Sequence, residues 1–325
     1  MRYKRLFSIS LIILTFSIII TLVHCTNLEK ISKEGSLTLH SVEIDGEPQQ
    51  YYLYLPSQEP IGVILVIPPL GGNHETYLIG ANWGSSEGNM TESPLVRTAK
   101  IYNLALIFTE GSSNGWYAPD DGEKKVLRCM EDANNTFLKL NRKKWFIYGF
   151  SMGGAGTITI TVRHPNLFSG LFSGGGLPDL TNDMWIAHYS RWWPCEELIQ
   201  TASPQQHLEV FYNRTIFLAC GTADPIFVNY DNFSQILDTH GIRHYYYRGN
   251  EGHTNQILLE TMNQTFNMFS HHLFGTLDTF FEDYTSPLTP ITISKSTQWS
   301  DNSSLVVIIV FFTIRVCIKY QKGRR

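Results

Sequence analysis

The stretch GFSMGGAG (residues 149–156) decides how the rest of the chain is interpreted. It follows KWFIYG (144–149), an apolar run typical of a buried strand, and it contains the pattern G-x-S-x-G. That pattern carries chemistry only where its serine lies on a sharp turn between a strand and a helix. The next residues, TITITV (157–162), are alternating and β-branched, which suits a strand better than a helix.

Two interpretations of residues 153–163 compete. As a strand, TITITV would pair with KWFIYG through a glycine turn, and Ser151 would then have no special role. As a helix, it would cross to a second parallel strand within LFSGLFSGGG (167–176). We favour the helix, because tertiary packing overrides weak helix propensity and the glycines allow close approach to a sheet.

Apolar runs bounded by turn residues alternate with helical spacing, which predicts one α/β domain over residues 30–280 with a mostly parallel sheet flanked by helices. The predicted buried strands cover residues 61–67, 104–109, 144–149, 167–176, 215–221 and 244–249. Helical periodicity covers residues 122–140, about 230–237 and 254–273. Residues 35–55 predict an N-terminal antiparallel hairpin, and residues 178–214 predict a small cap-like insertion.

Three polar residues follow three of the predicted strands: Ser151, Asp224 in GTADP (221–225) and His253 in GNEGHT (249–254). Their order along the chain is Ser, Asp, His, which is the order of a hydrolytic triad on a parallel sheet. Asp231 is the rival for the acid. His240 and His244 are the rivals for the base, but they lie before or inside a strand.

With these residues in place, the chain resembles the secreted α/β-hydrolase esterases of the feruloyl esterase and polyhydroxybutyrate depolymerase type. The resemblance covers roughly residues 35–275, and its further motifs are VIPPLGGN (66–73), GSSNGWY (111–117) and H-P-x-x-F (164–168). It implies an α/β-hydrolase fold and a serine hydrolase that cleaves carboxylic esters through an acyl-enzyme intermediate, without a cofactor or metal. The substrate would be a small-molecule or polymer-linked ester.

The resemblance also implies a role for each site residue. Ser151 would be the nucleophile, His253 the general base and acid, and Asp224 the group that orients the imidazole. The backbone N–H of Met152 and that of Gly71 or Gly72 would bind the oxyanion. Here the chain departs from the HGGG form, since Pro69 and Leu70 stand where a histidine is common.

Two other functions remain as alternatives. The same triad serves amides, which would make the chain a serine peptidase, and a protein without catalysis would use the fold for binding at a cell surface. Large aromatic side chains are candidates for a substrate pocket, although such residues are more often plain core; they are Trp83, Trp116, Trp192 and Trp193. His74 is expected at the surface.

Both ends of the chain are apolar and basic. Residues 1–25 combine MRYKR with an uncharged run and predict a signal peptide or signal anchor. After a linker at residues 281–303, residues 304–325 combine a short apolar run with a basic tail and predict a C-terminal transmembrane anchor. We therefore expect the domain in the secretory pathway, either extracellular or lumenal.

Six N-x-[S/T] sequons, more than composition gives by chance, agree with that location: Asn89, Asn134, Asn213, Asn232, Asn263 and Asn302. Among the cysteines of the domain, which are Cys129, Cys195 and Cys220, at most one disulfide can form, and their spacing does not select it. No CxxC or HExxH motif occurs, so we expect no structural metal. A net charge of −4 with dispersed Lys and Arg gives no footprint for nucleic acid.

Overall fold

The computed structural model describes residues 35–79, 87–111, 117–178 and 196–284 of the 325-residue chain. The chain divides into two units, residues 1–283 and 284–325, and all the helices and strands below belong to the first. The predicted signal segment (1–25) and the predicted C-terminal anchor (304–325) lie outside the described residues. Among the helices described, none has both the length and the apolar character needed to cross a bilayer.

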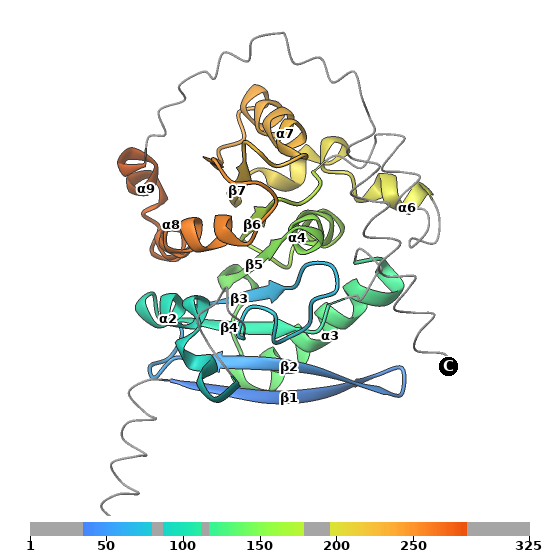
Figure 1. Cartoon of the computed structure of the whole chain (residues 1–325), viewed down its shortest axis with the longest axis vertical. Helices are drawn as coiled ribbons and strands as arrows, with labels where there is room; N and C mark the ends of the chain where they lie inside the picture. The colour runs from blue at the N-terminus through green and yellow to red at the C-terminus, as the bar shows by residue number, and fades with distance from the viewer. Residues whose placement is uncertain (1–34, 80–86, 112–116, 179–195, 285–325) are drawn as a thin grey trace, which may run out of the picture. The chain divides into compact units, whose positions relative to one another are not determined.

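An eight-stranded sheet forms the centre of the first unit, with the strand order β1-β2-β4-β3-β5-β6-β7-β8 (Figure 1). The strands are β1 Ser36–Ile44, β2 Glu47–Leu55, β3 Gly62–Ile67, β4 Leu104–Thr109, β5 Trp145–Phe150, β6 Gly170–Gly174, β7 Thr215–Gly221 and β8 Tyr245–Gly249. The pairs β1–β2 and β2–β4 are antiparallel, and every other pair is parallel. The predicted mostly parallel sheet with an N-terminal hairpin is confirmed.

The hairpin turns at the two residues that the sequence indicates. Asp45 and Gly46 both have positive φ, at 56° and 84°, as a two-residue turn between twisted antiparallel strands requires. The central strands β3, β4, β5 and β7 are buried along their whole length, which explains their continuous apolar sequence.

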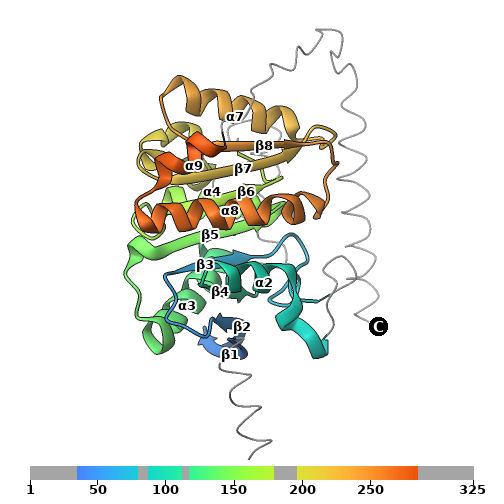
Figure 2. The ribbon, with the colours of Figure 1, turned by 90° about the vertical axis from the view of Figure 1, so that its left-hand side faces the viewer.

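Helices cover both faces of the sheet (Figures 1 and 2). Helices α2 and α8 contact each other on one side, whereas α3 and α4 lie on the other. The α-helices are α2 Pro94–Ile101, α3 Lys124–Ala133, α4 Met152–Arg163, α6 Glu196–Thr201, α7 Phe227–Thr239, α8 Gln256–Phe274 and α9 Leu277–Asp283. Short helical segments are η2 Glu87–Glu92, η3 Pro119–Glu123, η4 Asn134–Leu138, η5 Arg142–Lys144, η6 Pro204–Gln206 and η7 Leu208–Phe211.

Residues 152–163, which read as a strand by propensity, form helix α4. The helix is buried from Met152 to Val162 and packs on β5 and β6, so burial of its apolar side chains outweighs its poor propensity. Threonine suits this buried position because its hydroxyl bonds back to the helix: Thr157 Oγ1 donates to Gly154 O (2.7 Å) and Thr161 Oγ1 to Thr157 O (2.7 Å). The predicted crossover helix is confirmed.

Helices α2 and α9 were absent from the predicted elements, and α9 extends the domain three residues into the predicted linker. The N-terminus of α2 carries an ordinary start signal, since Ser93 Oγ accepts from Val96 N (3.4 Å) and Pro94 occupies the first turn. In the predicted insertion, residues 196–214 form α6, η6 and η7, and the remainder lies outside the described residues. Its role as a cap stays a prediction.

Candidate active site

The three candidate residues lie at the carboxyl ends of neighbouring parallel strands. Ser151 follows β5, Asp224 follows β7 and His253 follows β8. Because β5, β6, β7 and β8 are adjacent in the sheet, residues separated by about a hundred positions meet at one edge. This edge is where open α/β sheets bind their ligands.

Ser151 occupies a strained turn between β5 and α4. Its φ and ψ are 58° and −123°, a conformation that costs a non-glycine residue of order 1–3 kcal/mol. The turn is held by a hydrogen bond from Ser151 N to Gly174 O (2.8 Å). Although Ser151 precedes the first turn of α4, its hydroxyl does not cap the helix and is therefore free for another partner.

The glycines of the G-x-S-x-G pattern are required by close packing. A Cβ on Gly149 would lie 2.5 Å from Gly153 O, and one on Gly153 would lie 2.5 Å from Ile67 O. Both obstacles are backbone atoms, which cannot move aside like a flexible side chain. The glycines therefore let α4 begin directly against the ends of β3 and β5.

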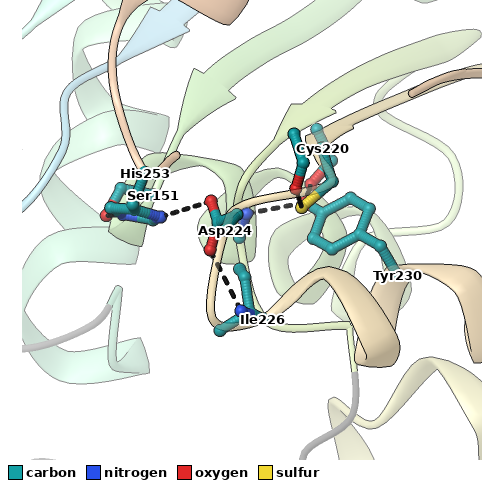
Figure 3. Close-up of polar contacts among 9 residues, drawn as sticks. Ser151, Cys220, Asp224, Ile226, Tyr230 and His253 are labelled. Carbon is teal, nitrogen blue, oxygen red and sulfur yellow. Dashed lines mark hydrogen bonds and ion pairs between the residues drawn. The ribbon is translucent and has the colours of Figure 1, made fainter. Parts of the chain in front are cut away.

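A chain of hydrogen bonds joins the three side chains, and Figure 3 shows its link between His253 and Asp224. His253 Nδ1 lies 2.7 Å from Asp224 Oδ2, and His253 Nε2 lies 2.8 Å from Ser151 Oγ. Since a carboxylate only accepts, Nδ1 carries the proton, Nε2 is the acceptor and the Ser151 hydroxyl donates to it. The arrangement can remove the serine proton and hold the resulting imidazolium.

The surroundings of Asp224 and His253 differ in exposure. The Asp224 side chain is 2% exposed and its second oxygen, Oδ1, accepts from Ile226 N (3.0 Å), whereas the His253 side chain is 39% exposed. Phe150 packs on the imidazole with a ring-centroid distance of 4.9 Å. The acid is thus fixed and desolvated, while the imidazole is partly exposed to solvent.

The loops that carry the acid and the histidine are bonded to each other. Thr222 N donates to Gly249 O (2.8 Å) and Ala223 N donates to Glu251 O (3.2 Å). These bonds continue the β7–β8 ladder beyond its last paired residues, Gly221 and Gly249. Asp224 and His253 therefore keep a fixed separation.

The rival residues have other partners. Asp231 Oδ1 accepts from Arg248 (2.7 Å) and does not contact His253. His240 Nδ1 bonds to Ile236 O (2.8 Å), and His244 bonds to Ser234 Oγ (2.6 Å). Of the candidates for acid and base, the structure brings only Asp224 and His253 to Ser151.

The predicted oxyanion donors lie at a helix start and in a loop. Met152 is the first residue of α4, where backbone N–H groups lack an intrahelical acceptor. In the loop after β3, Gly71 has a φ of 73° and open space around it, whereas Gly72 N donates to Pro69 O (2.9 Å) within a turn. The N–H of Gly72 is thus already engaged.

Several other predictions can be compared with the structure. The expectation that His74 lies at the surface is wrong: it is 6% exposed, 5.4 Å from the Tyr52 ring and 3.6 Å from Glu110. The predicted pocket residues, Trp83, Trp116, Trp192 and Trp193, lie outside the described residues. Cys129 and Cys220 are buried free thiols, and burial raises the pKa of Cys129 to about 12, so it is a neutral thiol.

The sequence alone did not indicate the residues that lie beneath Ser151, Asp224 and His253, which we call the trio. Gly175 has a φ of 51°, and a Cβ there would lie 3.4 Å from both Asp224 Oδ2 and His253 Cε1. The run Gly174-Gly175-Gly176 at the end of β6 was the signal that could have indicated a close approach. Nothing in the sequence indicated that the hydroxyl of Tyr230, the fourth residue of α7, would accept a hydrogen bond from Gly176 N.

Residues 119–253 match the prolyl oligopeptidase family, a range that includes all three residues and ends at His253. The protein named "Putative esterase NocK" from Nocardia uniformis subsp. tsuyamanensis is 24% identical over 152 residues. That match spans 44% of this chain and 42% of the relative, so it covers less than half of either protein.

Solved structures share the architecture. FphF, a fluorophosphonate-binding serine hydrolase of Staphylococcus aureus, has a TM-score of 0.59 at 16% identity and covers 73% of this chain and 98% of its own. An S-formylglutathione hydrolase from Agrobacterium tumefaciens has a TM-score of 0.60 at 15% identity, covering 74% and 96%. A ferulic acid esterase has a TM-score of 0.59 at 14% identity, covering 73% and 98%. The chain therefore has the α/β-hydrolase fold, and part of its sequence is similar to the prolyl oligopeptidase family and to a protein named as an esterase.

Proposed function

We propose that this protein is a serine carboxylic ester hydrolase that works through an acyl-enzyme intermediate. The observation that carries the proposal is the hydrogen-bonded chain from Ser151 Oγ through His253 to Asp224, with Ser151 on a strained turn (Figure 3). A serine hydroxyl is a weak nucleophile at neutral pH, and a neutral imidazole at 2.8 Å is the base that it needs.

In the first step, Ser151 Oγ attacks the ester carbonyl carbon while its proton passes to His253 Nε2. The carbonyl π electrons move to oxygen, and the tetrahedral intermediate holds that negative charge. Asp224 stabilises the imidazolium through Nδ1–H. His253 then gives the proton to the alkoxide leaving group as the C–O bond breaks, which leaves an acyl-Ser151 ester and a free alcohol.

In the second step, water replaces the alcohol. His253 removes a proton from the water as its oxygen attacks the acyl carbon, and the same proton returns to Ser151 Oγ when the acyl–oxygen bond breaks. The products are a carboxylic acid and the free serine. The partial exposure of the His253 side chain agrees with the access that this water requires.

The negative oxygen of each tetrahedral intermediate needs fixed donors. We assign the backbone N–H of Met152 as one donor, because it is the first N–H of α4. Of the two loop glycines, we assign Gly71 rather than Gly72 as the second, because the Gly72 N–H already donates to Pro69 O.

A serine peptidase is the second candidate, favoured by the match of residues 119–253 to the prolyl oligopeptidase family. The triad chemistry is the same for an amide, and the difference is protonation of an amine rather than an alcohol. We rank the esterase first because the named relatives in sequence and structure include esterases.

We also propose that the domain is displayed outside the cytosol, with residues 1–25 as the signal and residues 304–325 as an anchor. The sequons agree with this proposal, because the side chains of Asn89, Asn213, Asn232 and Asn263 are exposed and Asn134 is half-buried. Treatment of the protein from eukaryotic cells with an N-glycanase, followed by electrophoresis, tests it. Unchanged mobility would contradict the proposal.

The enzymatic proposal is tested by labelling with a fluorophosphonate, which reacts with activated serines. Wild type is expected to label, whereas Ser151→Ala and His253→Ala are not. Undiminished labelling of Ser151→Ala would overturn the assignment of the nucleophile, and an unlabelled wild type would overturn hydrolase activity. A chain-length series of aryl esters, compared with peptide amides, then separates the esterase from the peptidase.

A further inference from the structure

A second hydrogen-bonded chain lies directly beneath the trio and contains none of its members. The Tyr230 hydroxyl, on α7, accepts from Gly176 N (2.6 Å) and lies 2.7 Å from Ser173 Oγ. Ser173 Oγ in turn donates to Gly154 O in the first turn of α4 (2.8 Å). Ser173 and Tyr230 are both fully buried.

The direction of every bond in this chain is determined. The single Ser173 hydroxyl proton is used on Gly154 O, so Ser173 Oγ can only accept from Tyr230. The Tyr230 hydroxyl therefore donates to Ser173 and uses its oxygen to accept from Gly176 N–H. The order Gly176 N–H, Tyr230 O–H, Ser173 O–H, Gly154 C=O connects α7, the end of β6 and the nucleophile helix.

The glycine run at residues 174–176, which begins at the last residue of β6, is the floor of the candidate site. Gly174 O accepts from Ser151 N (2.8 Å), and Gly175 N donates to Ala219 O on β7 (2.9 Å). Gly175 lies below the contact between Asp224 and His253, as its Cβ position shows. A shift of this floor would change the distance from Ser151 to the His253–Asp224 pair.

We infer that Tyr230 is a positioning residue: through its hydroxyl it fixes the 174–176 floor and the first turn of α4, and so sets Ser151 against His253. This inference rests on the proposed function. Tyr230 suits the task because α7 follows the Asp224 loop, in which Asp224 Oδ1 accepts from Ile226 N. One helix thus carries the group that holds the floor and continues the loop that holds the acid (Figure 3).

A phenylalanine would fill the same space but could not replace the hydroxyl. Without it, Gly176 N–H would be a buried donor with no acceptor, which is costly, and the loop would move to find one. Burial raises the pKa of Tyr230 well above its ordinary value, so the group stays a neutral phenol able to donate and accept.

The test uses the full-length protein and three variants. Tyr230→Phe removes the hydroxyl, and Ser173→Ala cuts the chain one link further on. Tyr148→Phe is the matched control, because the Tyr148 hydroxyl in β5 is also fully buried but has no hydrogen-bond partner among the described residues. For each protein, kcat and KM are measured with an aryl acetate well below its melting temperature. The hydrogen bond between His253 and Asp224 is followed by the NMR signal of the His253 Nδ1 proton.

Small misplacements of reacting groups are costly, so Tyr230→Phe is expected to lower kcat about tenfold and to leave KM within about twofold. Ser173→Ala is expected to lower kcat less, and Tyr148→Phe to leave it unchanged. A longer hydrogen bond to Asp224 would also move the NMR signal of the His253 Nδ1 proton upfield in Tyr230→Phe.

An active wild type together with a Tyr230→Phe variant that keeps both kcat and the His253 Nδ1 proton signal would overturn the inference, whatever its melting temperature. An inactive wild type would overturn the proposed function alone, and the His253 Nδ1 proton signal would then decide the positioning role. If Tyr230→Phe does not fold, Ser173→Ala decides the question by the same two measurements.

Discussion

Two groupings of serine, histidine and aspartate can be compared within the described residues, and their difference shows what a site requires beyond its residue types. In the second grouping, Ser234 Oγ lies 2.6 Å from His244 Nε2, and Asp238 Oδ1 lies 3.8 Å from His244 Nδ1. The tautomer is the same as in the first, because His244 Nδ1 donates to Ile242 O (3.0 Å). By composition alone the two groupings are equivalent.

Their surroundings are opposite. Ser151 lies on a strained turn with its imidazole partner 39% exposed, whereas Ser234 lies inside α7 with a partner that is 4% exposed. The aspartates are reversed as well: Asp224 is 2% exposed and Asp238 is 61% exposed. The second grouping has a buried serine and an acid that is mostly in water, so we infer that it has a structural role and holds α7 to the residue that precedes β8.

The largest difference is expected between the two serines. Ser151→Ala should reduce kcat for an aryl ester by about 10⁴-fold or more, because the nucleophile is lost. Ser234→Ala should keep wild-type kcat and cost about 1 kcal/mol of stability, the value of one hydrogen bond. Steady-state kinetics and urea unfolding measure both. Comparable losses of kcat in Ser151→Ala and Ser234→Ala would contradict the proposed difference between the two serines.

The two acids give the next largest contrast. Asp224→Asn should lower kcat by about 10³–10⁴-fold, since the amide favours the wrong imidazole tautomer. Asp238→Asn should leave kcat unchanged because its carboxylate is 3.8 Å from His244 and mostly in water. A full loss of activity in Asp238→Asn would show that the second grouping is coupled to the first.

Ser151 lies on a tightly packed turn, whereas Ser234 lies inside a regular helix. Gly153→Ala tests how much the turn at Ser151 depends on this close packing. The added methyl would lie 2.5 Å from Ile67 O and 2.8 Å from Pro68 O, and the overpacking should cost about 1–3 kcal/mol. We also expect slower fluorophosphonate labelling, because the start of α4 must shift. Thermal unfolding and labelling rate are the measurements, and an unchanged melting temperature would refute the packing argument.

The smallest effect is a pH dependence that belongs to the second grouping. Burial lowers the pKa of His244 below its ordinary value of 6.5, so the folded protein binds fewer protons there than the unfolded chain. The stability that the neutral, buried His244 contributes is fully present above pH 6.5 and is lost as the pH falls toward the lowered pKa. Replacement by a neutral residue, His244→Gln, should flatten the fall in urea midpoint below pH 6.5. His40 and His272, whose pKa values burial also lowers, would keep part of the slope.

Most of the sheet could be predicted because its strands are continuous apolar runs with turn residues at both ends. Residues 104–109 and 215–221 match β4 and β7 at both boundaries. Helix α4 was the harder case, since its local propensity opposes its structure and only the order of later strands favoured a helix. Helix α2 was missed although Ser93-Pro94 is a good start signal and its buried residues have helical spacing, because the helix is only eight residues long.

The meeting of Ser151, Asp224 and His253 followed from their positions after parallel strands, a topological argument that needs no side-chain detail. The floor of the site did not follow. Contacts such as Tyr230 to Gly176, or Phe150 to His253, depend on side-chain directions within α7 and β5 that a linear sequence does not specify. The burial of His74 was missed for the same reason.

The two backbone bonds that extend the β7–β8 ladder have a mechanical consequence. They make the loops of the acid and the histidine move as one unit. They also attach both loops to β8, which is an edge strand of the sheet. Edge elements open at lower free energy than the centre of a fold. Fraying that begins at this margin would therefore separate base from nucleophile while β3, β4 and β5 remain intact, so catalysis should fade on heating before the core melts.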